Sequence, residues 1–501
     1  MQQRPARILP TLRRRNNRAR RIDLRGLILL PAFLITLSGC GGDAPSGPTA
    51  KTVPHAGVAL ELRCPDEAFR SAISHSAQSW ATRTGATLTL TASGDDADVD
   101  VIPVEEFGLR ADRGDLVPVP ASLRASDHPY QWSGLLPAYR ERLIEWGGQA
   151  RALPLAGEGL VVVYRTDRLA EPNLIAAYEK RAGAKPHAPA TWEEFAALAA
   201  AFAEVDGRPS LPAMSGPELA DLFFRVAACY DRQPLTDAGL AALGGAGKLS
   251  FQHDGQTGDP RLGAPGFAAA ADWLAGLAAG KCLATDPSAD LAGGKAMLGV
   301  LSLAQVARLK PPGGEIPPRF AVAALPGTWT STDEKTGQLV RGGAPNYIPY
   351  FGGGRLGVVR TQCKHPEAAF DLLADLGSPT RSLELLSNPA LGAGPFRAAH
   401  LEQDRLLVWL GYGFDAERSR ALVAALQQNV RTEVRNPAYA LRGPDAKELD
   451  AAAAAELAEV AAGRVSGAEG LKRLRAAWDR IDQQTPAETR LKWRRLAAGL
   501  N

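Results

Sequence analysis

The spacing of apolar and polar residues changes several times along the first part of the chain. Residues 58–64 alternate between the two classes, which predicts a strand, and alternation returns at 86–93 and at 96–104. Between them, residues 65–85 carry an apolar side chain every three or four positions and end at a glycine, which predicts a helix. The order strand, helix, strand favours parallel pairing through a right-handed crossover. An α/β unit is therefore expected at 58–104.

Three further helices are predicted from their apolar stripes and their start signals. The segment 189–207 begins with Thr191, and Glu194 three positions later completes a capping box. Residues 365–379 have Pro366 near their start and stop at Gly-Ser-Pro, and residues 466–481 repeat the Ser-x-x-Glu start. Three tryptophans on these helices and the first one are expected in the core: Trp80, Trp192 and Trp478.

Segments rich in glycine and proline separate these helices. Residues 253–266 resemble a calcium loop in their acidic positions but lack the closing glutamate, so a surface loop is expected. Residues 310–318 and 327–354 are expected to be long loops, and loops of this length are often functional.

The first forty residues are not expected to be part of the fold. Residues 4–25 contain nine arginines and one acid, and the apolar stretch 26–37 follows. A basic start, a short apolar run and small residues are typical of a secretory signal peptide. Leu37-Ser38-Gly39-Cys40 resembles the bacterial lipobox, which implies cleavage after residue 39 and lipidation of Cys40. A transmembrane helix is disfavoured because the run is shorter than the roughly 20 residues of a span.

The predicted signal peptide changes the meaning of the net charge. The formal charge is +3, but the arginine-rich start contributes most of the positive charge, so the chain from Cys40 on is near −5. A nucleic-acid partner is therefore not expected. Residues 40–56 are rich in Gly, Pro, Ser and Ala and are predicted to be a flexible tether.

Four cysteines follow Cys40 in the chain. Two of them, Cys229 and Cys282, fall in Ala-rich helical stretches that we place in the same lobe, so a disulfide between them is predicted. The chain has no Cys-x-x-Cys pair and its seven histidines are scattered, so neither a metal site nor a cofactor is expected.

Several segments, in order, resemble the extracellular solute-binding proteins of ABC importers (family 1, maltose-binding-protein-like) in their lipoprotein form. They include "SHSAQSWATRTGATLTL", "ARALPLAGEGLVVVYRTDRL", "PATWEEFAALAAAF" and "GKAMLGVLSLAQVARL". The similarity continues through "FGGGRLGVVRTQCKHPEAAFDLLADLGSP" and "NPALGAGPFRAAHL" to the last helix pair, and it spans nearly all of residues 58–483.

The resemblance implies an α/β, two-lobe periplasmic-binding-protein-like fold of type II, with hinge-crossing strands and a ligand cleft. Lobe one is expected at 57–153 plus 352–400, and a helix-rich lobe two at 154–351 plus 401–490. Ligands of open α/β sheets bind beyond the carboxyl ends of the strands. Two lobes with flexible crossings can close on such a ligand like a hinge.

Three acids are candidate ligand contacts. Glu158 matches the position where sugar-binding members of the family place an acid facing the cleft, and a carboxylate accepts sugar hydroxyls strongly. Glu105 lies in the predicted loop after a strand that lines the family's cleft. Asp66 also follows a strand, although helix capping is the favoured role there.

Aromatic side chains are candidate platforms for stacking on sugar rings. Four of them lie in or beside the long predicted loop: Trp329, Tyr347, Tyr350 and Phe351. Packing of the loop is the alternative role for each. Leu303 stands where maltodextrin-binding members carry an aromatic, so maltodextrin itself is not implied.

The sequence thus predicts a lipid-anchored extracytoplasmic protein, on the periplasmic side or the cell surface, that delivers a small solute, expected to be a saccharide, to ABC permease subunits. We expect a monomer. Because no hydrolase motif is found, the chain is not expected to be an enzyme. Two alternatives stay open: a ligand-sensing lipoprotein, or a secreted glycan-acting hydrolase using a pair of acids such as Glu105 and Glu158.

Overall fold

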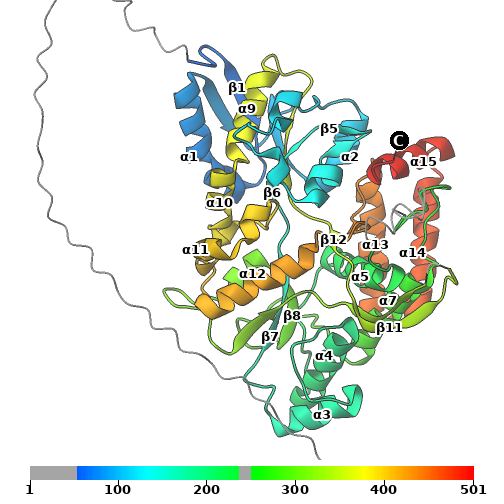
Figure 1. The fold of residues 1–501 in the computed structure, drawn as a ribbon. Coiled ribbons are helices and arrows are strands. Elements are labelled where there is room, and N and C mark those ends of the chain that lie inside the picture. Colours follow the sequence, from blue (N-terminus) through cyan, green and yellow to red (C-terminus); the bar gives the residue numbers. More distant parts are fainter. Residues whose placement is uncertain (1–52, 236–249, 334, 501) are drawn as a thin grey trace, which may run out of the picture. The chain divides into compact units, whose positions relative to one another are not determined.

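A five-stranded sheet organises the first lobe, with the strand order β2-β1-β3-β13-β6. The computed structural model describes residues 53–235, 250–333 and 335–500 (Figure 1). The predicted signal peptide, Cys40 and most of the tether lie outside these residues. The sheet strands are β1 (Ala59–Arg63), β2 (Thr87–Thr91), β3 (Val99–Pro103), β6 (Leu153–Ala156) and β13 (Arg355–Val359).

Pairing in this sheet follows the predicted order of elements. β1 is parallel to both β2 and β3, whereas β13 runs antiparallel to β3 and to β6. Helix α1 (Glu67–Thr84) connects β1 to β2 and ends at Gly85, whose φ of 74° suits a residue without a side chain. The expected α/β unit at the start of the fold is confirmed.

A three-stranded antiparallel sheet, β8-β7-β9, organises the second lobe. Its strands are β7 (Leu160–Arg165), β8 (Leu298–Ser302) and β9 (Phe320–Ala323). Most of this lobe is helical, with α3 (Pro172–Ala182), α4 (Trp192–Asp206), α5 (Gly216–Asp231), α7 (Pro265–Ala279), α12 (Ala416–Val430), α13 (Ala446–Ala461) and α14 (Gly467–Asp482). The predicted capping box of Thr191 and Glu194 starts α4.

Shorter elements, besides several 3-10 turns, belong to the described part of the chain. Lobe one also contains α2 (Val104–Asp112), a π-helical turn (Tyr139–Leu143), β4 (Glu145–Trp146), β5 (Gln149–Ala150), α9 (Pro366–Leu376) and α10 (Pro379–Leu386). The others are α8 (Leu303–Ala307), β10 (Thr328–Thr332), β11 (Leu339–Asn346), β12 (Tyr350–Phe351), α11 (Leu406–Leu410), β14 (Ala438–Tyr439) and α15 (Ala487–Ala497).

Two apolar clusters form the core, and β7 separates them. Val161 and Val163 belong to the cluster that fills lobe one and extends over one face of the β8-β7-β9 sheet, whereas Val162 belongs to the cluster under the lobe-two helices. A strand turns successive side chains to opposite faces, so one buried strand serves both clusters. The three tryptophans predicted in the core are buried, with at most 1% of each exposed: Trp80, Trp192 and Trp478.

Two chain segments cross between the sheets, each next to glycines. Residues 157–159 lead from β6 to β7, and residues 352–354 lead from β12 back to β13. The first crossing also pairs with the later segment around Gly394, because the N–H of Gly157 donates to Gly394 O at 3.0 Å. The α/β two-lobe fold with crossing segments is therefore the predicted one.

Three local predictions are corrected by the structure. Residues 327–354 do not form a long loop, since β10 and β11 pair as an antiparallel ribbon whose exposed second strand lacks an apolar alternation. Glu105 lies in helix α2, not in a loop. Cys229 and Cys282 do not form a disulfide, because both are buried free thiols in the structure.

Among the described residues, no helix is both long enough and apolar enough to cross a membrane.

Candidate functional site

A cavity of about 1000 Å³ lies between the two lobes. Lobe one supplies the turn after β1, the end of β3, the start of α2 and Arg355, which we call the lobe-one wall. Helices α5 and α13, Tyr350 and the turn before α13 form the lobe-two wall, and the crossing at 352–354 completes the lining. This volume is at the upper end of the roughly 300–1,000 Å³ found for small-molecule sites.

Asp66 lies on the lobe-one wall and has two partners. One carboxylate oxygen accepts the N–H of Phe69 at 3.0 Å and so caps α1, and the other pairs with the Arg355 guanidinium. Burial disfavours the charge, but the Phe69 N–H and Arg355 outweigh it and hold the pKa of Asp66 below its usual value. Asp66 therefore caps a helix, as favoured, and faces the cavity as well.

A buried carboxylate holds two arginines of the lobe-one wall in place. Asp100 is fully buried on β3 and binds three guanidinium groups: Arg63 at 2.6 Å, Arg110 at 2.7 Å and Arg360 at 3.2 Å. Arg63 and Arg110 line the cavity. Their hydrogen bonds to Asp100 fix both guanidinium groups in place, so the lobe-one wall offers pre-oriented hydrogen-bond donors to a ligand.

Glu105 lines the cavity from the first turn of α2. The helix begins directly after Pro103, so the carboxylate lies near the helix N-terminus and not on a mobile loop. Burial, followed by the neighbouring Glu106, raises its pKa.

Asp450 lies on the opposite wall, on α13, and sequence reasoning missed it. Burial raises its pKa to about 7, with further contributions from the charges of Glu105 and Asp221. No described residue forms a hydrogen bond or ion pair with its carboxylate. The one sequence feature that could have drawn attention to Asp450 is its place directly before a run of five alanines in this helix.

Glu158 binds a buried arginine beside the first crossing. Its carboxylate lies 2.6 Å from Nη2 of Arg225, which is only 4% exposed. Arg225 also binds Asp221 through Nε at 2.6 Å and donates to the carbonyl oxygen of Tyr350 at 2.9 Å. The arginine thus joins α5 to both crossings, because Glu158 belongs to the first and Tyr350 begins the strand that leads into the second.

Glu158 also explains why glycine occupies position 353. A Cβ atom on Gly353 would lie 3.0 Å from the Glu158 carboxylate oxygen, so a side chain there would crowd the ion pair. The carboxylate is 21% exposed but does not line the main cavity. A second cavity, of about 490 Å³, shares Pro217 and Asp221 with the first, so the Glu158–Arg225–Asp221 network lies where the two meet.

Only one of the four candidate aromatic residues lines the main cavity. Tyr350 does so, and its ring centre lies 4.9 Å from the Arg225 guanidinium. The side chain of the next residue, Phe351, belongs to the lobe-one cluster and stacks on Tyr439 at 5.8 Å. Neighbouring residues of a strand point to opposite faces, which explains this separation.

The other two aromatic candidates pack the protein locally. The Arg341 guanidinium lies 4.9 Å from the ring centre of Trp329, on the ribbon of β10 and β11. The hydroxyl of Tyr347 donates to the carbonyl oxygen of Asn429 at 3.1 Å, beside a separate hollow of about 330 Å³. Leu303 is fully buried.

The predicted contacts thus divide into two groups. The main cavity brings together Asp66, Glu105 and Tyr350. Four predicted contacts do not line it: Glu158, Trp329, Tyr347 and Phe351.

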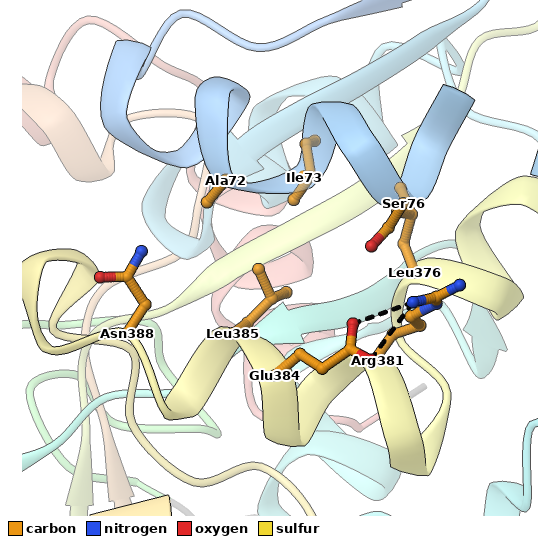
Figure 2. Close-up of a pocket in the computed structure, with 8 residues that line it drawn as sticks. All are labelled: Ala72, Ile73, Ser76, Leu376, Arg381, Glu384, Leu385 and Asn388. Atoms are coloured by element: carbon orange, nitrogen blue, oxygen red, sulfur yellow. Dashed lines mark hydrogen bonds and ion pairs between the residues drawn. The ribbon is translucent and has the colours of Figure 1, made fainter. Parts of the chain in front are cut away.

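A smaller hollow of about 100 Å³ lies on lobe one between α1 and α10. Figure 2 shows Ala72, Ile73 and Ser76 of α1 across from α10, where Arg381 and Glu384 pair with each other at 3.0 Å. This volume is well below that of typical small-molecule sites. Within the described part of the chain, no group of three His, Cys, Asp or Glu residues could hold a metal ion.

Comparisons with known proteins agree with this architecture. No curated protein matches the chain in sequence. Among solved structures, the chain is similar to the GacH receptor of Streptomyces glaucescens, with 15% identity, a TM-score of 0.55 and coverage of 85% of this chain and 99% of that one. A cyclic alpha-maltosyl-1,6-maltose binding protein from Arthrobacter globiformis has 13% identity, a TM-score of 0.61 and coverage of 85% and 100%.

A third similar structure is an ABC transporter solute-binding protein from Agrobacterium radiobacter, with 17% identity, a TM-score of 0.57 and coverage of 84% and 98%. At these identities the similarity concerns the fold. The family model for bacterial extracellular solute-binding proteins matches residues 69–405, which is more than half of the sequence. The chain therefore belongs to the family of bacterial extracellular solute-binding proteins.

Proposed function

We propose that this protein is a lipid-anchored extracytoplasmic receptor that binds a saccharide or related polyol in the main cavity and delivers it to an ABC importer. The cavity between the lobes carries the proposal, because carboxylates line it from both lobes and guanidinium groups line it from lobe one. Carboxylates accept strong hydrogen bonds from sugar hydroxyl groups, and guanidinium groups donate hydrogen bonds to the hydroxyl oxygens. The Tyr350 ring offers an apolar face.

The named ligands of the similar structures support this class of solute. GacH was solved with acarbose, and the Agrobacterium radiobacter protein was solved in complex with ribitol. In the present chain, Glu105 and Asp221 are the proposed hydroxyl acceptors. Glu158 holds Arg225, which in turn orients Asp221, so its contribution to binding is the positioning of another carboxylate.

One observation favours a second class of ligand. Asp450 has no partner among the described residues, and Glu105 and Asp221 act on it electrostatically. A ligand with a protonated amine would stabilise the ionised form of Asp450, so amino sugars and polyamines belong in any screen.

Binding is tested by a thermal-shift screen of neutral sugars, polyols, amino sugars, polyamines and peptides. A true ligand at 100 times its Kd stabilises the folded state by about 2.7 kcal/mol. Glu105→Gln should weaken binding roughly tenfold or more, because a hydrogen bond to a charged acceptor contributes about 1.5–3 kcal/mol. The matched control, Glu384→Gln at the small hollow of Figure 2, should leave binding unchanged. Stabilisation by peptides alone would contradict the proposed ligand class.

The lipid anchor is a separate part of the proposal, supported by the Leu37-Ser38-Gly39-Cys40 sequence and by the extracellular character of the family. Cys40→Ser should move the protein from the membrane fraction to the soluble fraction of cells that produce it. Retention of this variant in the membrane fraction would contradict an anchor at Cys40. Uptake of the radiolabelled ligand distinguishes import from sensing. Deletion of the gene abolishes uptake if the protein serves import and leaves it unchanged if the protein only senses the ligand.

A further inference from the structure

The last helix of the chain contacts both lobes close to the cavity. Helix α15 (Ala487–Ala497) lies well beyond residue 405, where the match to the family model ends. In Figure 1 it is the red helix at the C-terminal end, near α2 and α13. Its contacts with both lobes indicate its role.

A buried ion-pair cluster fixes α15 to lobe two. Both terminal nitrogens of Arg494 bind Asp445, each at 2.6 Å, and Nη2 also binds Asp482 at 3.0 Å. Only 5% of the Arg494 side chain is exposed, against 11% for Asp445 and 6% for Asp482. Bidentate, buried pairs of this kind have a defined geometry, so α15 has a rigid attachment to the segments that flank α13 and α14.

The same helix contacts lobe one through the residue next to Arg494. The indole N–H of Trp493 donates to the carboxylate of Asp112, the last residue of α2, at 2.8 Å. Trp493, Leu496 and Ala497 pack against the cluster that contains the lobe-one core, and Leu496 lies beside Gly147 of lobe one, with its Cδ2 3.8 Å from the position of a Cβ there. Separation of α15 from lobe one would therefore expose apolar surface to water and leave the indole N–H without its partner.

Arg442 adds a second link between the same three parts. Its guanidinium donates to the carbonyl oxygen of Arg142 in lobe one at 2.8 Å and to the carbonyl oxygen of Ala497 in α15. Its own carbonyl oxygen lies directly on α2, since a Cβ at Gly108 would approach it to 1.6 Å. Burial lowers the pKa of Arg442 to about 10.

These contacts lie directly behind the rim of the cavity. Leu109 and Arg110 line the cavity from α2, and Gly443 and Pro444 line it from the turn before α13. Trp493 and Arg494 in turn lie against Gly443, at 4.0 Å and 3.1 Å from the position of a Cβ there. Opening of the cavity by a hinge motion requires α2 to move away from this turn, and α15 joins the two.

We propose that α15 is a C-terminal strap that holds the two lobes together beside the cavity and limits how far they open without ligand. A hinge motion changes the distance between the lobes while each lobe keeps its own core. The contacts of Trp493 and Leu496 break in such a motion, whereas the Arg494 cluster moves with lobe two. The strap thus favours the arrangement seen here even when the cavity is empty.

The distance between the lobes, measured without ligand by electron–electron double resonance, tests the strap. Spin labels on Ser71→Cys in α1 and Lys472→Cys in α14 report on lobe one and lobe two, and both positions are exposed. The chain from Gly41 to Asn501 keeps every residue that the structure describes, and its own four cysteines are buried. Because no ligand is added, the result does not depend on the proposed function.

Trp493→Ala, and a chain that ends at Gln484, should shift the distance distribution to longer values and broaden it. Lys492→Ala, an exposed change on the same helix, should reproduce the original distribution. The proposal is overturned if Trp493→Ala leaves the distribution unchanged, or if Lys492→Ala shifts it equally. If the shortened chain does not fold, Trp493→Ala alone decides.

Discussion

The two walls of the cavity differ in how their charges are matched. On the lobe-one wall, Arg63 and Arg110 share Asp100, and Arg355 pairs with Asp66. On the lobe-two wall, Asp221 shares one arginine with Glu158, and Asp450 has no partner among the described residues. The arginines of the lobe-one wall are therefore part of a fixed polar frame, whereas the lobe-two wall presents a carboxylate, Asp450, that no ion pair with a described residue holds in its charged form.

The largest effect should follow from breaking the fixed frame at Asp100. Asp100→Asn leaves three guanidinium groups without the carboxylate that they share, and loss of one partner of a buried ion pair costs about 3 kcal/mol or more. Urea unfolding measures this free energy. The control, Asp167→Asn, removes an exposed partner of Arg165 and should cost less than about 1 kcal/mol. Equal losses for the two variants would mean that the frame does not stabilise lobe one.

A smaller effect, opposite in sign, is expected on the lobe-two wall. The pKa of Asp450 is about 7 in the folded protein and about 4 in an unfolded chain. Between these values the unfolded state loses the proton while the folded state keeps it, so the contribution of Asp450 to stability is complete below pH 4 and is lost as the pH rises through 7.

The difference of about three pH units between the two pKa values corresponds to at most about 4 kcal/mol, and solvent screens the partly exposed carboxylate. Asp450→Asn should therefore make the protein about 1–2 kcal/mol more stable than the original at pH 8, with little difference at pH 4. Urea unfolding at a series of pH values between 4 and 8 measures the difference. Glu448→Gln, an exposed change on the same helix, should follow the original curve. Parallel curves for Asp450→Asn and the original protein would show that Asp450 titrates normally.

Local patterns predicted much of the fold because their causes are local. The capping box of α4, the left-handed Gly85 after α1 and the alternation of the first strands each depend on a few neighbouring residues. The crossings were predicted from the family resemblance. By contrast, the exposed ribbon of β10 and β11 lacks an apolar face, so its sequence has no period that could reveal it.

The site was predicted less completely because it depends on distant segments. Asp450 and Glu105 influence each other electrostatically although 345 positions separate them in the sequence. No local sequence pattern connects the two residues. Tyr350 and Phe351 were equivalent candidates until the strand face was known. The failed disulfide has the same cause: helical context placed both cysteines in one lobe, yet the Cys229 thiol points to the carbonyl oxygens of Pro326 and Ile348.

The four buried thiols have a practical consequence for measuring how the lobes come apart. Cys64 and Cys363 lie in lobe one, and Cys229 and Cys282 lie in lobe two. Burial raises the pKa of each, to about 12 for Cys229 and to about 11 for the others, and alkylating reagents attack the thiolate. Each pair of thiols can therefore be alkylated only while its own lobe is unfolded. Pulsed alkylation thus measures the unfolding rates of the two lobes separately in a single sample.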